Sequence, residues 1–92
     1  MIRTFRDKDV EALFHDNAVP RFRNIERVAR RKLLYLNAAK RLEDLRVPPA
    51  NQLEALKGDR KGQHSIRVND QWRICFRWHD GEVLEVEIVD YH

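Results

Sequence analysis

Residues 53–74 read LEALKGDRKGQHSIRVNDQWRI, and this stretch decides the fold of the chain. Two short apolar segments flank a loop bounded by Gly58 and Gly62, and glycine permits the positive φ angle that a sharp turn requires. A second turn at Asn69 and Asp70 leads into a run of residues typical of β-strands. The pattern predicts strands joined by tight turns, with a basic loop between the first two.

Positive charge is concentrated in the same stretch. Its five cations are Lys57, Arg60, Lys61, Arg67 and Arg73, and its three acids are Glu54, Asp59 and Asp70. The whole chain has a formal net charge of only +3, so the distribution of charge matters more than its total. A turn-rich cationic surface of this kind suits a partner that carries phosphate groups.

Helical periodicity dominates residues 7–45. Asp7 is placed to cap a short helix whose apolar residues follow i, i+3, i+4 spacing. These residues are Val10, Leu13 and Phe14. Residues 21–45 are predicted to form one amphipathic helix of about six turns, ended by Pro48 and Pro49. Its apolar stripe consists of Phe22, Ile25, Ala29, Leu33 and Leu36.

From Ile66 onward the apolar period changes to two, as in β-strands. One face carries Trp72, Ile74, Phe76 and Trp78, followed after a hairpin turn at His79-Asp80-Gly81 by Leu84, Val86 and Ile88. The other face is polar, with Arg73 and Arg77 expected opposite Glu85 and Glu87. With a short strand predicted at residues 1–5, the class is α+β: an N-terminal strand and a helical hairpin packed on one face of a mainly antiparallel sheet.

Length and composition set further limits. Ninety-two residues are expected to form a single domain, residues 1–92, with a modest core. No apolar run is long enough to span a membrane and no signal-peptide pattern is present, so a cytoplasmic location is expected. One cysteine, Cys75, excludes an internal disulfide, and four scattered histidines lack zinc-ligand spacing. Neither a metal nor a cofactor is expected.

The charged residues suit one kind of chemistry. Cleaving RNA without a metal requires a base for the ribose 2′-OH proton, cations for the pentavalent phosphate and an acid for the departing 5′-oxygen. Asp90 or His92 can serve as the base, and lysine or arginine can hold the phosphate. A simpler interpretation remains for each residue. The last three residues can be a frayed tail, and Arg67 or Arg73 can be a solvated or paired strand residue.

A resemblance supports the catalytic interpretation. Residues 53–74, the opening Met1-Ile2-Arg3-Thr4-Phe5 and the ending Asp90-Tyr91-His92 resemble the HigB-type toxins of the RelE/ParE superfamily, in order and over essentially the whole chain. The resemblance implies a RelE-like fold and a ribosome-dependent endoribonuclease, an mRNA interferase that inhibits translation. It also implies a HigA-type helix-turn-helix antitoxin as partner, with promoter DNA bound only through that antitoxin.

The resemblance also implies roles for individual residues. The catalytic residues that it implies are Asp90, Tyr91, His92, Arg73 and Lys57. The charge of the basic stretch, and not the resemblance, makes Arg60, Lys61 and Arg67 the expected RNA-binding residues. One position departs from the family, because members can have histidine where this chain has Glu54. The proton transfers then depend more heavily on Asp90 and His92, and the activity is expected to be weaker.

Two other functions are compatible with the same residues. A ParE-like toxin would inhibit DNA gyrase on this fold without cutting RNA, since a fold does not determine a function. A non-catalytic RNA-binding module would need only the basic residues of the long helix. The Asp-Tyr-His ending and the dense basic loop favour the nuclease.

Overall fold

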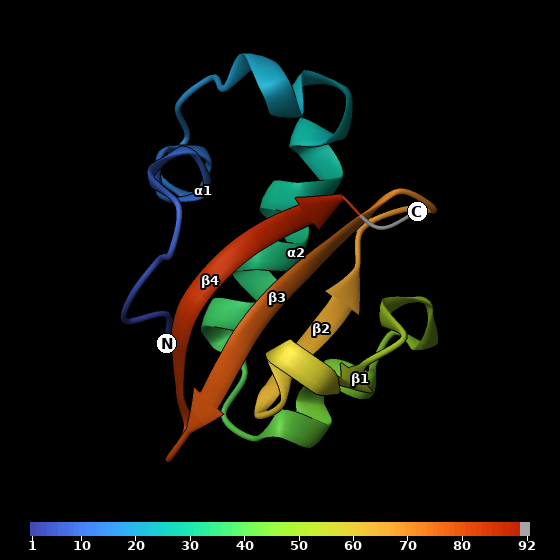
Figure 1. Ribbon diagram of the computed structural model, residues 1–92. Coiled ribbons are helices and arrows are strands. Elements are labelled where there is room, and N and C mark those ends of the chain that lie inside the picture. Colours follow the sequence, from blue (N-terminus) through green and yellow to red (C-terminus); the bar gives the residue numbers. More distant parts are fainter. Residues whose placement is uncertain (91–92) are drawn as a thin grey trace.

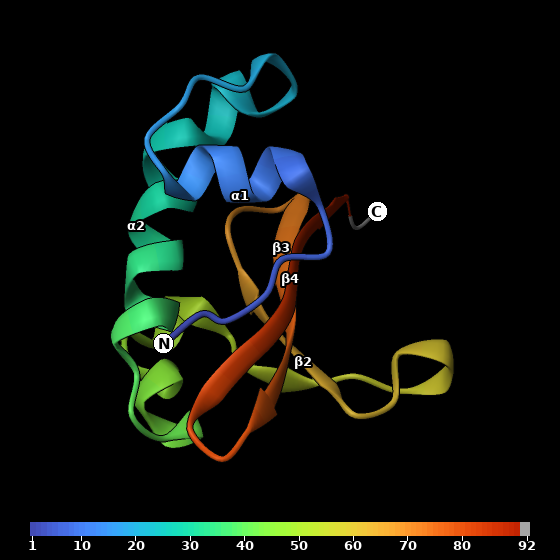
Figure 2. The same cartoon turned by 90° about the vertical axis from the view of Figure 1, so that its left-hand side faces the viewer.

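The computed structural model describes residues 1–90 and consists of helices on one face of a four-stranded antiparallel sheet (Figures 1 and 2). The strands lie in the order β1-β2-β3-β4. They are β1 (Glu54–Ala55), β2 (Gln63–Arg67), β3 (Trp72–His79) and β4 (Glu82–Asp90). This arrangement confirms the predicted α+β class. None of the helices in the described part of the chain is long and apolar enough to cross a lipid bilayer.

Two α-helices cover the inner face of the sheet, α1 (Lys8–Phe14) and α2 (Glu26–Ala38) (Figure 2). Asp7 caps α1 as predicted, because its carboxylate accepts a hydrogen bond of 2.8 Å from the backbone N–H of Asp9. Short 3₁₀ helices complete the helical part of the chain. They span Pro20–Ile25, Leu42–Arg46, Pro49–Asn51 and Gly58–Arg60.

The prediction of one continuous helix over residues 21–45 is wrong. Residues 20–25 form a 3₁₀ helix, and α2 ends at Ala38. The carboxylate of Asp44 accepts hydrogen bonds from the backbone N–H groups of Lys40 and Arg41, at 3.0 and 3.1 Å. This local bonding competes with the helical pattern and starts a separate turn. The predicted apolar stripe is nevertheless buried.

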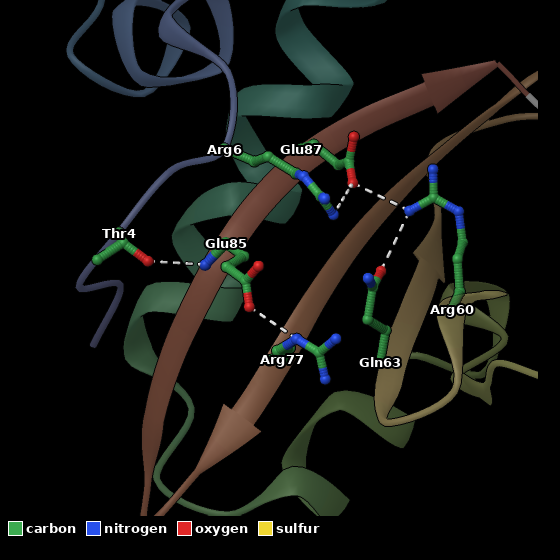
Figure 3. Close-up of polar contacts among 7 residues, drawn as sticks. All are labelled: Thr4, Arg6, Arg60, Gln63, Arg77, Glu85 and Glu87. Carbon is green, nitrogen blue, oxygen red and sulfur yellow. Dashed lines mark hydrogen bonds and ion pairs between the residues drawn. The ribbon is translucent and has the colours of Figure 1, made fainter.

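The N-terminal segment runs parallel to β4 but does not form the predicted strand. It makes only two isolated bridges, Ile2 to Val83 and Phe5 to Val86. Between them, β4 bulges outward at Glu85, which has a φ angle of +54°. The hydroxyl oxygen of Thr4 accepts the Glu85 backbone N–H at 2.8 Å (Figure 3), so a side chain replaces the regular ladder there.

The bulge also changes which side chains of β4 enter the core. Val83 lies opposite Trp78 and is fully buried, whereas Leu84 lies opposite Arg77 on the outer face. The prediction that Leu84 belongs to the apolar face is therefore wrong, because one extra residue reverses the alternation. Beyond the bulge the pattern recovers, and Val86 and Ile88 are buried as predicted.

The core lies between the helices and the inner face of β3. Ile74 and Phe76 are fully buried, and Trp72 packs edge-to-face on Phe22 with the ring centroids 5.7 Å apart. The β3–β4 turn is confirmed as an Asp80-Gly81 hairpin, in which both residues have positive φ angles, +49° and +79°. These tryptophan and phenylalanine rings are thus core residues and not a platform for RNA bases.

Candidate active site

The outer face of the sheet, which the helices leave open, carries the polar side chains. The strand register aligns Glu54 with Ser65, Ser65 with Cys75, Cys75 with Glu87, and Arg67 with Arg73. Partners that lie opposite each other in a ladder project from the same face. The outer face therefore gathers Glu54, Gln63, Ser65, Arg67, Arg73, Cys75, Arg77 and Glu87.

Arg73 lies near one end of this face and is held tightly. Its Nε donates to the hydroxyl of Ser65 at 2.8 Å, and one terminal nitrogen donates to the carbonyl oxygen of Gln52 at 2.6 Å. A Glu54 carboxylate oxygen lies 3.9 Å away. Arg73 exposes only 7% of its surface, which corrects the expectation of a freely projecting side chain paired with β4. Carbonyl and hydroxyl acceptors satisfy its donors instead.

A buried polar chain fixes the carbonyl group that holds Arg73. Gln52 has a left-handed backbone with a φ angle of +45°, directly after the buried side chain of Asn51. The Asn51 amide donates to the carbonyl oxygens of Leu45 and Val47, at 3.2 and 3.3 Å, and its oxygen accepts from Lys32 Nζ. Burial lowers the pKa of Lys32. The position of Arg73 therefore depends on a helix on the other face of the sheet.

Asp90 and Arg67 come to the same end of the sheet as Arg73. Asp90 lies opposite Trp72 in the β3–β4 ladder, next to Arg73, and accepts a hydrogen bond of 3.0 Å from the Gln71 side chain. Arg67 lies opposite Arg73 and is ion-paired with Asp70. Tyr91 and His92, which complete the expected catalytic set, lie outside the described residues.

The basic loop, Lys57–Gly62, divides into two parts. Lys57 and Lys61 are exposed where the loop stands away from the sheet (Figure 2), and positive φ angles at Gly58 and Gly62 allow its turns. Arg60 instead folds back onto the outer face, where it contacts Glu87. The length of β2 separates the loop from the end of β4. The fold thus brings Arg73 and Arg67 together on the outer face, and places Asp90 at the same end of the sheet but opposite the inward-facing Trp72. Lys57 and Lys61 lie beyond the opposite end of β2.

A small cleft beside Arg60 contains residues that sequence reasoning did not select. It has a volume of about 310 Å³ and is lined by Arg6, Asp59, Arg60, Gln63 and Glu87. Arg6 and Glu87 are far apart in the chain, so no spacing pattern connects them. The only sequence signal for this cleft was the alternation of charged residues in β4, which placed Glu85 and Glu87 on the outer face. The same alternation correctly predicted an ion pair beside the cleft, the 2.7 Å contact between Arg77 and Glu85 (Figure 3).

Cys75 and His64 do not contribute reactive groups to this face, and Ser65 has no base beside it. Burial raises the pKa of the Cys75 thiol, which disfavours a nucleophilic thiolate. His64 projects toward the opposite face, where its ring stacks on Phe76, and burial lowers its pKa. It cannot act as a base for the neighbouring Ser65. Between residues 1 and 90, no group of His, Cys, Asp and Glu side chains is arranged to hold a metal ion.

The fold is that of the RelE-like toxins. The structure matches a chain of the heterotetrameric YoeB–YefM toxin–antitoxin complex from Staphylococcus aureus with a TM-score of 0.62, covering 100% of this chain and 98% of that one at 16% sequence identity. A second YoeB–YefM structure from the same organism matches with a TM-score of 0.53 and equal coverage. At this identity the likeness concerns the fold.

Sequence comparison gives the particular family. Residues 3–92 match the HigB-like toxins, described as the RelE-like toxin of type II toxin–antitoxin system HigB. Toxin HigB-1 of Vibrio cholerae serotype O1 is 44% identical over 86 residues, which are 91% of this chain and 90% of that protein. Endoribonuclease HigB of Proteus vulgaris is 33% identical over the full length of both proteins. The chain therefore belongs to the HigB-like toxins of type II toxin–antitoxin systems, as predicted.

Proposed function

We propose that this toxin is a ribosome-dependent endoribonuclease that cleaves messenger RNA by metal-independent acid–base chemistry and so inhibits translation. The observation that carries the proposal is the immobilised Arg73 beside the strand end that bears Asp90. A cation fixed before the substrate arrives needs no reorganisation when charge grows on the phosphate. Its place of action is the cytoplasm, where ribosomes translate mRNA.

The reaction assigns one role to each group. Asp90 or His92 accepts the proton of the ribose 2′-OH, which then attacks the adjacent phosphorus atom. Arg73 stabilises the pentavalent phosphate, and a protonated side chain from the Asp90-Tyr91-His92 ending supplies the proton to the departing 5′-oxygen. The products carry a 2′,3′-cyclic phosphate and a 5′-hydroxyl group. Lys57, Lys61, Arg60 and Arg67 bind phosphates along the RNA, and Lys57 contributes its charge from the loop.

Glu54 adjusts this site. Its carboxylate lies 3.9 Å from the guanidinium of Arg73, on the same face as Ser65. A negative charge at this distance reduces the attraction of Arg73 for a phosphate, which histidine at the same position would not do when neutral. We therefore expect slower cleavage than in relatives with histidine, and Glu54→His should increase the rate.

The partner we propose is a HigA-type helix-turn-helix antitoxin, which binds promoter DNA on behalf of the complex. The family assignment to type II systems supports an antitoxin, and the helix-turn-helix class extends that assignment. Purification of the toxin alone from a growing, unaffected host would contradict both its toxicity and its need for such a partner.

A test of the catalytic proposal uses purified toxin, ribosomes and a defined mRNA. Primer extension should show new 5′ ends only when ribosomes are present, and the upstream fragments should end in a cyclic phosphate. Inhibition of DNA supercoiling without RNA cleavage would favour a gyrase inhibitor instead. RNA binding without new ends would favour a non-catalytic module. Either result would refute the proposed activity.

A further inference from the structure

Two arginines from distant parts of the chain meet on one carboxylate in the cleft beside β4. Arg6 comes from the N-terminal segment and Arg60 from the basic loop, and both guanidinium groups reach Glu87 (Figure 3). The nitrogen-to-oxygen distances to Glu87 are 3.5 Å from Arg6 and 2.9 Å from Arg60. Arg60 also donates to the side-chain oxygen of the buried Gln63 at 3.1 Å.

The charge of this cleft is balanced inside the molecule. Arg6 and Arg60 face two acids, Asp59 and Glu87, among the lining residues. Guanidinium groups bind carboxylates and phosphates through the same planar arrangement of donors. The Glu87 carboxylate therefore occupies the place that a phosphate oxygen would take between the two arginines. An anion can use both arginines fully only after Glu87 has moved aside.

The cleft also lies in line with the proposed catalytic centre. Glu87 is opposite Cys75 in the ladder, and Cys75 is two residues along β3 from Arg73. Two residues of a strand span about 6.7 Å, which is close to the spacing of neighbouring phosphates in an extended RNA strand. The cleft can therefore hold the phosphate next to the one bound at Arg73. An RNA backbone that crosses the outer face from Arg73 toward the basic loop passes over this cleft.

We propose that Arg6 and Arg60, supported by Gln63, form a second phosphate-binding subsite, and that Glu87 fills it in the free toxin. The subsite holds an RNA phosphate next to the one that is cut. Glu87 acts as an internal competitor, so the toxin binds RNA less tightly than its arginines alone would allow. This inference rests on the proposed function, because its ligand is RNA.

The alternative is that Glu87 only ties the loop to the N-terminal segment. The two roles predict opposite results for Glu87→Gln. A structural tie would leave RNA binding unchanged or weaken it, because the loop would lose its anchor. A competitor would strengthen binding when its charge is removed. Glu82→Gln is the matched control, since it removes the same charge from the same strand and breaks a comparable ion pair, the 3.0 Å contact with Arg3.

The experiment measures binding of the full chain to a short RNA with 2′-O-methyl groups on every ribose, which cannot be cut. Fluorescence anisotropy at low and moderate salt gives the dissociation constants. Glu87→Gln should bind about three- to tenfold more tightly than the unmodified toxin at low salt, and Glu82→Gln should differ from it by about twofold at most. Equal binding by the two variants, or weaker binding by Glu87→Gln, would overturn the subsite.

A second variant decides the question even if Glu87→Gln fails to fold. The Arg6 side chain is half exposed, and Arg6→Met leaves its backbone hydrogen bond to Val86 in place. Losing one phosphate contact should make the plot of log affinity against log salt shallower by about 0.7. In the Arg6→Met background, the gain from Glu87→Gln should shrink. An unchanged slope and affinity in Arg6→Met would refute the subsite.

The outcomes also separate this inference from the proposed function. If the unmodified toxin cuts ribosome-bound mRNA and Glu87→Gln binds RNA no more tightly than Glu82→Gln, the subsite fails and the nuclease stands. If the toxin cuts nothing but Glu87→Gln still binds the methylated RNA more tightly, the subsite stands and the nuclease fails.

Discussion

Two basic surfaces of this toxin differ in how their arginines are held. On the outer face of the sheet, Arg73 and Arg60 are fixed by hydrogen bonds to Ser65, Gln63 and the Gln52 carbonyl group. On α2 and the 3₁₀ helix before it, three arginines line an open groove of about 570 Å³ and have no ion-pair partner among residues 1–90. These three, called here the groove arginines, are Arg23, Arg27 and Arg31.

This difference indicates that one surface serves catalysis and the other serves association with RNA. A fixed arginine has already lost its side-chain entropy, so it can stabilise a transition state without further ordering. A mobile arginine keeps that entropy and contributes long-range, salt-dependent attraction to a polyanion. We therefore assign the chemistry to the outer face and the association with ribosomal RNA to the groove arginines. The predictions below test this division from the largest expected effect to the smallest.

Replacing Arg73 should have the largest effect. Arg73→Ala removes the fixed cation, and the single-turnover cleavage rate on ribosomes should fall about 10²- to 10³-fold, with a much smaller change in affinity. It also leaves the buried hydroxyl of Ser65 and the carbonyl oxygen of Gln52 without their donor, and the buried group should cost about 1–3 kcal/mol of unfolding free energy. Cleavage at the full rate by the folded variant would show that the outer face is not the catalytic face.

The second-largest effect is expected from Lys32, which helps to position Arg73 through Asn51. Lys32→Met keeps much of the side-chain volume but removes the donor to Asn51, which precedes the Gln52 carbonyl that holds Arg73. The rate at saturating ribosome concentration should fall about three- to tenfold with unchanged KM, because a misplaced group costs rate. The exposed Lys40 provides the control, and Lys40→Met should cut normally. A change in KM alone would contradict the positioning role.

The groove arginines should show the opposite behaviour. Replacing Arg23, Arg27 and Arg31 together by glutamine should weaken ribosome association about tenfold at low salt, and the difference should disappear as salt is raised. The single-turnover rate at saturation should not change. Arg30 is left in place, since it holds the carbonyl groups of Leu13 and Asn17. A loss of rate that persists at saturation would break the division between the two surfaces.

The smallest effect is expected on the pH dependence of stability, through His64 on the inner face of the sheet. Burial lowers the pKa of His64, so the folded toxin favours its neutral form. Below about pH 6.5 the unfolded chain takes up a proton there that the folded chain resists, and stability falls as the pH falls. His64→Gln should therefore reduce the loss of thermal stability on acidification. Parallel pH profiles for unmodified toxin and His64→Gln would contradict this reading.

Much of the fold followed from local patterns. The cap at Asp7, the Asp80-Gly81 turn and the alternation of β3 are each set by neighbouring residues, and all three were predicted correctly. The end of α2 at Ala38 was missed because the Asp44 carboxylate captures two backbone N–H groups. The bulge at Glu85 was missed because it depends on a side chain from the N-terminal segment.

The candidate site was only partly visible in the sequence. Alternation placed Arg73 on the outer face, but its burial depends on the Gln52 carbonyl and the chain of contacts from Lys32, which no spacing reveals. The cleft between Arg6 and Glu87 joins residues from opposite ends of the described chain. Sequence patterns identify which residues share a face, whereas packing decides which of them are held rigidly.

The most direct test of the catalytic assignment removes Tyr91 and His92. The shortened chain ends at Asp90, so it retains β4, the core and the groove arginines. Its single-turnover cleavage of ribosome-bound mRNA is compared with that of the complete chain, after circular dichroism has shown that both are folded and titration has shown that both bind the antitoxin. We predict that ribosome binding persists and that cleavage falls by about 10²-fold or more. Cleavage at the full rate by the folded, shortened toxin would contradict the account.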